Sequence, residues 1–389
     1  MILDESSTLR LGCQPGLAPF LAREVEALGM PVDRMERTAI LTHGSWEDAW
    51  RLCLELRTAH SVLRPLKRFP CDSPKTLYHS IRSIPWEEIV PEDGRLTVES
   101  TVDHPSIDNS MFPNLRVKDA ICDHLVKVRG TRPDSGSDRR GVVVHLHWAR
   151  DRATVSLNAA GRKLADRGYR KAAHRAPVRE TLAAAMVMDS GWDGRRPLLV
   201  PMCGSGTIAI EAALIALDRA PGLLRLGFAF ERTLGLDAER WRRMRTEVRS
   251  RGRKTLPAPI VATDLDPKAV EAARSNALTA GVEHLIEFDV RDFAATRVPS
   301  AAQDDGPGGV VIVNPEYGAR LGEEEALAPT YGRLGAWFRE SLPGWRCHVL
   351  SGNPRLTKHL GLKAGRRTPF VNSRIECRLL AYEIRDRGV

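Results

Sequence analysis

The second half of the chain alternates between short apolar runs and longer stretches in which apolar residues recur every three or four positions. The short runs predict strands near residues 195–202, 258–266, 284–293 and 309–318. The longer stretches predict helices near residues 179–189, 206–218 and 267–281. Strands that alternate with helices in this way form a mostly parallel, doubly wound sheet. We therefore expect one α/β domain over residues 166–389, with ligands bound at the carboxyl ends of its strands.

The first half of the chain has a different pattern. Runs rich in valine and threonine, "RLTVESTVDH", "GVVVHLHW" and "ATVSLNAAG", predict strands, and "LRVKDAICDHLVKVRG" carries apolar residues at helical spacing. Closer to the N-terminus, "APFLAREVEAL" and "EDAWRLCLELR" are typical of helices and "AILTH" of a strand. These patterns predict two small α+β domains, at residues 1–65 and 66–165.

Composition narrows the class of protein. The 389 residues carry a net charge of +9, which indicates either a polyanionic partner such as nucleic acid or a generally basic proteome. No apolar run approaches the roughly 18 residues of a membrane helix, and the N-terminus lacks the pattern of a secretory signal. The seven cysteines are scattered without a C-x-x-C pair. We therefore expect a cytoplasmic protein with reduced thiols, without a zinc site or a disulfide framework.

Two motifs at successive strand ends suggest a ligand site. In "LLVPMCGSGTIAIEAA", Gly204 and Gly206 form a turn between a strand and a helix, where the backbone approaches a ligand closely and free N–H groups are available. The turn matches neither a G-x-G-x-x-G motif nor a P-loop, and an ordinary strand–helix turn is the alternative. In "VATDLDP", Asp264 ends the next strand and is placed to accept hydrogen bonds from ribose hydroxyls, while Asp266 is expected to cap the following helix.

Two further strand ends carry polar or aromatic groups. Asp292 in "FDVRDF" is placed to accept from an adenine amino group, with the Phe293 ring beside it. In "GGVVIVNPEYGARLG", Asn314 and Pro315 offer two acceptors, a side-chain oxygen and a carbonyl, that converge on one exocyclic amine. Tyr317 follows and is placed to stack on the base that carries the amine, so that replacement by phenylalanine is expected to be mild. A turn with an exposed tyrosine is the alternative.

Together these motifs resemble the class I methyltransferases that use S-adenosylmethionine, in the amino-methylating branch with an N-P-P-Y signature. Nearly the whole chain resembles the THUMP-domain RNA guanine-N2 methyltransferases, which include a bacterial 23S rRNA enzyme and related tRNA enzymes. "LRVKDAICDHL" resembles the THUMP segment, "LADRGYRKAAHRAPVRETLAAA" the link into the catalytic domain, and "APGLLRLGFAFER" the stretch after the first catalytic helix.

The resemblance implies a Rossmann-like class I methyltransferase domain preceded by an α+β ferredoxin-like and THUMP RNA-binding region. It implies S-adenosylmethionine as cofactor and no metal. The residues it assigns to the cofactor are Cys203, Gly204, Ser205, Gly206, Asp264, Leu265, Asp292 and Phe293. It assigns the target amine to Asn314 and Pro315 and the stacked guanine to Tyr317. The implied partner is RNA, with rRNA favoured over tRNA.

Two departures from the family pattern keep other functions open. The family has an acid where this chain has Pro201, and a second proline where this chain has Glu316. An RNA-binding or assembly protein with a decayed pocket is therefore an alternative to an enzyme. DNA adenine and protein glutamine N-methyltransferases share the N-P-P-Y chemistry, but the THUMP-like first half argues against both.

The segment that joins the two halves is basic. Between residues 161 and 180 we expect the basic side chains to contact RNA phosphates, with a solvated charged surface as the alternative. These basic residues are Arg162, Lys163, Arg167, Arg170, Lys171, Arg175 and Arg179.

Overall fold

A computed structural model describes residues 2–385 apart from residues 105, 106, 108, 110, 138, 140, 173–177, 300–307 and 319–322. The chain divides into two compact units. The first, here the N-terminal unit, comprises Met1–Gln14, Leu21–Leu164 and Arg225–Glu247. The second, here the C-terminal unit, comprises Pro15–Phe20, Ala165–Leu224 and Val248–Val389. Helices α1 (Ala18–Ala27) and α7 (Ala238–Ser250) each include residues of both.

The N-terminal unit contains one eight-stranded sheet with the order β2-β3-β1-β4-β8-β7-β5-β6. Its strands are β1 (Ser7–Cys13), β2 (Arg34–Glu36), β3 (Ala39–Gly44), β4 (Ala59–Pro70), β5 (Arg95–Asp103), β6 (Asp134–Ser135), β7 (Val142–Ala149) and β8 (Arg152–Asn158). The helices are α2 (Trp46–Glu55), α3 (Pro74–Arg82) and α4 (Met111–Arg129), of which α3 packs on α4. The predicted α+β character is confirmed. The long strand β4, which the sequence analysis did not predict, continues through residues 65 and 66 and shifts register between Pro65 and Lys67.

The C-terminal unit contains a seven-stranded sheet with the order β11-β10-β9-β12-β13-β15-β14. Its strands are β9 (Leu198–Pro201), β10 (Ile260–Asp264), β11 (Ile286–Val290), β12 (Val310–Val313), β13 (Arg346–Ser351), β14 (Arg366–Asn372) and β15 (Ile375–Glu383). The first five pair in parallel, and β15 pairs antiparallel with β13 and β14. The helices of this unit are α5 (Glu180–Ser190), α6 (Thr207–Ala216), α8 (Pro267–Ala280) and α9 (Glu323–Ser341). The expected mostly parallel, doubly wound sheet is confirmed.

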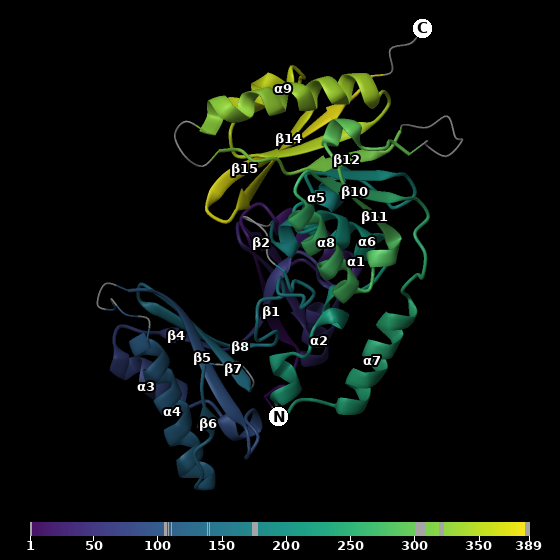
Figure 1. The fold of residues 1–389 in the computed structure, drawn as a ribbon. Coiled ribbons are helices and arrows are strands. Elements are labelled where there is room, and N and C mark those ends of the chain that lie inside the picture. Colours follow the sequence, from purple (N-terminus) through teal and green to yellow (C-terminus); the bar gives the residue numbers. More distant parts are fainter. Residues whose placement is uncertain are drawn as a thin grey trace. The chain divides into compact units, whose positions relative to one another are not determined.

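Burial explains why the central strands and one helix are apolar along their whole length. All four residues of β9 and of β12 are buried, as parallel strands covered on both faces require. In α6, nine of ten residues are buried, which fits a helix that is apolar on every side. Figure 1 shows α9 lying along the part of the sheet that holds β12, β14 and β15. Its residues Tyr331, Trp337 and Phe338 pack in a core cluster with the sheet.

Two findings bear on the expectations from composition. Each of the seven cysteines is a buried free thiol. Among the residues that the structure describes, no helix combines the length and apolarity needed to cross a membrane.

Candidate functional site

The sheet of the C-terminal unit brings the predicted motifs to one edge. Strand order reverses between β9 and β12, since the chain proceeds from β9 to β10 and β11 on one side and to β12 and β13 on the other. Loops that leave such a switch point diverge and leave a crevice at the carboxyl ends of the strands. The Cys203–Gly206 turn follows β9, Asp264 ends β10, and Asn314 follows β12. These groups therefore lie at the carboxyl edge of the sheet, where the sequence analysis expects ligands to bind.

The glycine turn after β9 has the backbone that its sequence predicts. Gly204 and Gly206 have φ values of +53° and +81°, a region that favours glycine. A Cβ on Gly204 would meet no atom within 4 Å, so this glycine leaves open space beside the turn. A Cβ on Gly206 would lie 2.9 Å from the Cβ of Ala273, so the second glycine allows α8 to pack closely. The N-cap of α6, which begins after the turn, is Gly206, a residue without a side chain to accept from the first N–H groups of the helix.

Asp264 holds the turn in place. Its Oδ2 accepts a hydrogen bond from the Gly204 N–H at 2.9 Å, and its Oδ1 accepts from the Asp266 N–H at 3.0 Å. Each carboxylate oxygen has a second lone pair, so the side chain still has acceptor capacity for a ligand. Asp266 caps α8 through the Lys268 N–H, as predicted. The neighbouring Leu265 side chain, at the same strand end, is 65% exposed.

Asp292 and Phe293 are held by protein contacts that the sequence analysis did not predict. Asp292 Oδ1 accepts from the Ala294 N–H at 2.9 Å and from an Arg333 guanidinium nitrogen at 2.8 Å. The Phe293 ring is 3% exposed, packs edge-on against Trp337, and has the Arg333 guanidinium 5.1 Å from its centre. Little of this ring is accessible to a ligand, so its expected contact with adenine stays a prediction.

Asn314 has a buried acceptor without a partner. Its Oδ1 is inaccessible to solvent and receives no hydrogen bond from the described residues. A buried polar atom without a hydrogen bond is destabilising, and Asn314 Oδ1 is one of eighteen such side-chain atoms in the described part of the chain. Pro315 beside it is buried, and Glu316 is exposed. This oxygen lies at the end of β12, on the edge that also holds Asp264.

Tyr317 is held by its hydroxyl group. The hydroxyl accepts a hydrogen bond from Asn372 Nδ2 at 2.6 Å and also bonds the Cys377 thiol. Burial raises the pKa of Tyr317 to about 12, so the phenol stays protonated. On the backbone side, the buried Tyr331 hydroxyl donates to the Glu316 carbonyl at 3.1 Å. The two contacts fix the conformation of the N-P-E-Y segment from α9 and from β14.

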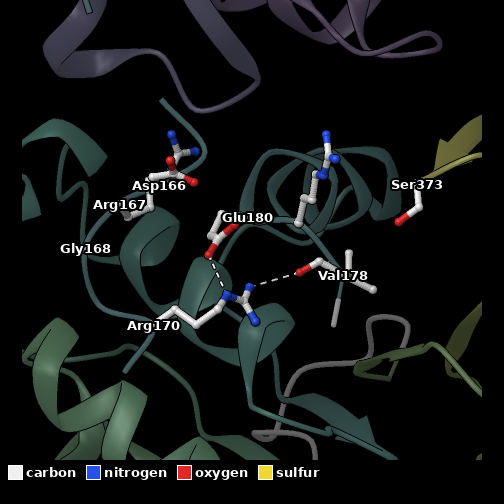
Figure 2. A pocket seen from close by; sticks show the side chains of 8 residues that line it. Asp166, Arg167, Gly168, Arg170, Val178, Glu180 and Ser373 are labelled. Atoms are coloured by element: carbon white, nitrogen blue, oxygen red, sulfur yellow. Dashed lines mark hydrogen bonds and ion pairs between the residues drawn. The ribbon is translucent and has the colours of Figure 1, made fainter. Parts of the chain in front are cut away.

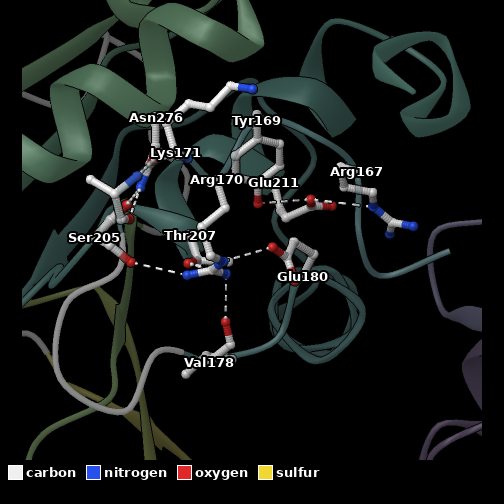
Figure 3. Close-up of polar contacts among 11 residues, drawn as sticks. Arg167, Tyr169, Arg170, Lys171, Val178, Glu180, Ser205, Thr207, Glu211 and Asn276 are labelled. Carbon is white, nitrogen blue, oxygen red and sulfur yellow. Dashed lines mark hydrogen bonds and ion pairs between the residues drawn. The ribbon is translucent and has the colours of Figure 1, made fainter. Parts of the chain in front are cut away.

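The segment before the glycine turn is clamped to that turn by two side chains (Figure 3). The Arg170 guanidinium pairs with Glu180 at 2.9 Å and donates to the hydroxyls of Ser205 and Thr207 at 3.1 and 3.0 Å. Asn276, on α8, is fully buried, and its side chain makes four hydrogen bonds with backbone groups. Its oxygen accepts from the N–H groups of Lys171 and Ala172, and its nitrogen donates to the carbonyls of Ala172 and Ser205.

These contacts correct part of the expectation for the basic joining segment. Arg167 is 1% exposed and lies 3.6 Å from a carboxylate oxygen of Glu211, which is fully buried. Arg170 is mostly buried in its pair with Glu180. A buried guanidinium that is already paired with a carboxylate is not available to RNA phosphates. Arg175 lies outside the described residues.

A pocket of about 430 Å³ lies beside this clamp (Figure 2). Arg170, Val178 and Glu180 line it from the clamp side, and Ser373 lines it from the turn between β14 and β15. Ser373 follows Asn372, the residue that holds Tyr317. The lining residues of this pocket include none of the predicted cofactor or target residues, so the pocket is not the crevice predicted for the cofactor.

The sequence analysis missed Asn276, Glu211 and Asn372. Two of them left a signal, because Asn276 and Glu211 are single polar residues within otherwise apolar helical faces. A polar group at such a position is usually satisfied by a specific partner. Asn372 left none, since a polar residue at the end of a strand is ordinary.

Three family models match successive parts of the chain. The model described as the RlmL ferredoxin-like domain matches residues 8–63, and the THUMP domain matches residues 71–158. The model described as the RMKL-like methyltransferase domain matches residues 167–381.

Relatives with known names agree with these matches. A ribosomal RNA large subunit methyltransferase K/L from Syntrophotalea carbinolica is 40% identical over 96% of this chain, but the match covers 53% of that protein. The chain thus spans about half the length of the curated relatives it matches. A putative methyltransferase solved with SAH is 27% identical, with a TM-score of 0.87, over 99% of this chain and 100% of that one. A Listeria monocytogenes structure titled as a predicted N6-adenine-specific DNA methylase is 29% identical, with a TM-score of 0.84, over 98% of this chain and 97% of that one.

The methyltransferase-domain model covers more than half of the chain and includes the glycine turn, Asp264 and the N-P-E-Y segment. This protein therefore belongs to the family of RMKL-like methyltransferase domains.

Proposed function

We propose that this chain transfers a methyl group from S-adenosylmethionine to the exocyclic N2 amine of a guanosine in large-subunit ribosomal RNA. The observation that carries the proposal is the place of Asn314 at the end of β12, on the sheet edge that also holds the glycine turn and Asp264, with an Oδ1 that receives no hydrogen bond from the described residues. An exocyclic amine is a donor that would satisfy it. The Pro315 carbonyl is the second acceptor for the same amine, since each backbone carbonyl has two lone pairs.

The residues at the strand ends fit the cofactor. The open space beside Gly204 and the uncapped N-terminus of α6 suit a chain that ends in a carboxylate. Asp264 has remaining acceptor capacity for ribose hydroxyls, and the exposed Leu265 offers an apolar surface for a base. When bound, S-adenosylmethionine supplies a methyl group that is already activated by its sulfonium. The protein is then required to position the amine and to exclude misaligned bases.

The two departures from the family pattern do not remove this chemistry. Pro201 provides no carboxylate for the cofactor's ammonium group. We expect this lack of a carboxylate to weaken cofactor binding. Glu316 is exposed, and its backbone carbonyl is held by Tyr331, so the acceptors at Asn314 and Pro315 do not depend on its side chain. An RNA-binding protein with a decayed pocket is the alternative that these departures suggest.

The choice of RNA as substrate rests on the THUMP match and on the names of the curated relatives. A guanine inside a duplex cannot reach a crevice at the sheet edge, so the target base must be unpaired or extruded. Transfer RNA is the second candidate. We also propose that the domains meet at residues 65/66 and 165/166. We further propose that the protein is cytoplasmic.

The decisive experiment compares Asn314→Ala with Asn314→Asp. Alanine removes the acceptor and is expected to lower methyl transfer about 10²- to 10³-fold, the usual effect of deleting one positioned hydrogen-bonding group. Aspartate keeps an acceptor and is expected to retain part of the activity. Calorimetry should show nearly normal S-adenosylmethionine affinity for both variants. A fully active Asn314→Ala enzyme would rule out the amine-holding role.

Two further measurements separate the alternatives. Absence of S-adenosylmethionine binding by the wild-type chain would favour the decayed pocket. Mass-spectrometric nucleoside mapping of rRNA and tRNA from a deletion strain identifies the RNA class, because N2-methylguanosine is lost from only one of the two.

A further inference from the structure

Helix α7 carries a concentration of arginine that the proposed active site does not use. Its central sequence is "RWRRMR", residues 240–245, and residues 239–254 contain eight basic side chains against two acids. Seven of the eight are arginine, the residue best suited to bidentate contact with phosphate. Like charges three or four positions apart, such as Arg242 with Arg245, repel each other and destabilise an isolated helix. Folding alone therefore does not account for this composition.

One face of α7 is fixed to the N-terminal unit by an aromatic cluster. Trp241 is 4% exposed, and its ring lies 4.9 Å from Phe230 and 6.5 Å from Trp50, edge-on to both. Residues 225–247 thus pack with the N-terminal unit, although they lie within the range matched by the methyltransferase-domain model. The segment adds a helix to the unit that also contains the THUMP match.

The remaining face is exposed, and acidic side chains neutralise only part of its charge. Arg242 and Arg249 are exposed, and neither has an acidic partner among the residues described here. They lie seven residues apart, about 10.5 Å along the helix axis and on the same flank. Arg243 pairs with Glu239, but both side chains are about two-thirds exposed, so the pair is readily exchanged for another anion. These three arginines form what we call the arginine face.

We propose that the arginine face of α7 binds the phosphate backbone of the substrate RNA. The inference rests on the proposed function for the identity of the polyanion. Charge complementarity and the arginine composition suit a polyanion, and the THUMP match in the same unit, together with the proposed activity on RNA, favours phosphates over an acidic protein surface. The contact gives affinity without reading sequence, because phosphates are the same at every nucleotide.

The test is the salt dependence of RNA binding by the full chain. The probe is a fluorescein-labelled RNA hairpin with unpaired guanosines in its loop. The variant combines Arg242→Gln, Arg243→Gln and Arg249→Gln, since glutamine preserves helix propensity and length. Each lost phosphate contact should reduce the slope of log Kd against log salt by about one, so we expect a decrease of about two to three. A matched control replaces three exposed basic residues outside α7, in Lys358→Gln, Lys363→Gln and Arg367→Gln.

The outcomes are distinguishable. A reduced slope in the α7 variant alone, with circular dichroism and S-adenosylmethionine affinity unchanged, supports the inference. An unchanged slope, or an equal reduction in the control, overturns it and leaves the proposed function standing. Wild-type chain that binds no RNA would overturn both.

Discussion

Replacing Asn372 by alanine is expected to weaken RNA recognition without affecting the cofactor. The Asn372 amide donates to the Tyr317 hydroxyl at 2.6 Å and is only 7% exposed, so water cannot replace it easily. A hydrogen bond of this kind contributes about 0.5–1.5 kcal/mol. At 1.4 kcal/mol per tenfold change, its loss should raise the KM for RNA about two- to tenfold. The physical reason is that, without this hydrogen bond, the Tyr317 ring has to be ordered when the base binds, and the entropy lost in that ordering weakens binding.

The structure also revises the expectation for Tyr317→Phe. From the sequence this change is expected to be mild, because the ring remains. In the structure, phenylalanine leaves the Asn372 amide in a buried site without its acceptor, which costs about 1–3 kcal/mol. We therefore expect a lower free energy of unfolding and a higher KM for the single variant.

A double-mutant cycle isolates this contact. The four proteins are the wild type, Asn372→Ala, Tyr317→Phe and the double variant, and each is assayed for methyl transfer, urea unfolding and calorimetric binding of S-adenosylmethionine. In the phenylalanine background, Asn372→Ala should have little further effect on KM, since the hydroxyl it contacts is already absent, and it should recover part of the free energy of unfolding because the unsatisfied amide is removed. Strictly additive effects on KM, or a change in cofactor affinity of the same size, would refute the reasoning.

Three further predictions concern other parts of the C-terminal unit. Asp264→Ala should weaken S-adenosylmethionine binding by about 1.5–3 kcal/mol in calorimetry, because the variant loses a charged acceptor and the hydrogen bond that holds the Gly204 N–H. Unchanged affinity would show that Asp264 is not part of the cofactor site. Glu316→Pro should preserve or raise methyl transfer, and a lower rate would give the Glu316 side chain a role of its own. Burial lowers the pKa of His348 from 6.5 to about 3, so the unfolded chain binds a proton there that the folded chain does not. This residue should therefore reduce the free energy of unfolding as pH falls from about 6.5 toward 3, by up to about 1.4 kcal/mol per pH unit. In urea unfolding, His348→Leu should lose less of its free energy of unfolding over this pH range than the wild type. Equal pH dependence in both proteins would contradict this.

The sequence by itself determined the parts of the fold that depend on local patterns. Apolar runs and helical spacing located β9, β10, β12, α5, α6 and α8, because burial on a strand or helix is repeated within a few residues. The same local logic located the glycine turn, Asp264 and Asn314, since each directly follows a strand whose end the pattern reveals. The strand β4 escaped prediction because Pro65 interrupts its pattern at a register shift, a feature that only the neighbouring strand β8 makes visible.

Tertiary structure alone decided which partner each polar side chain has. The sequence places Arg167 and Arg170 in a basic segment. It does not show whether each arginine faces solvent or a buried carboxylate, because the carboxylate can be distant in the chain. Glu211, the partner of Arg167, is 44 positions away. Asn276 contacts Lys171 across 105 positions, and Asn372 contacts Tyr317 across 55. Phe293 likewise follows a strand as predicted, yet Trp337 and Arg333 from α9 cover its ring. Hydrogen bonds and packing act over a few ångströms in space, and the sequence does not show which partner a side chain will meet, so the partners become known only when the chain has folded.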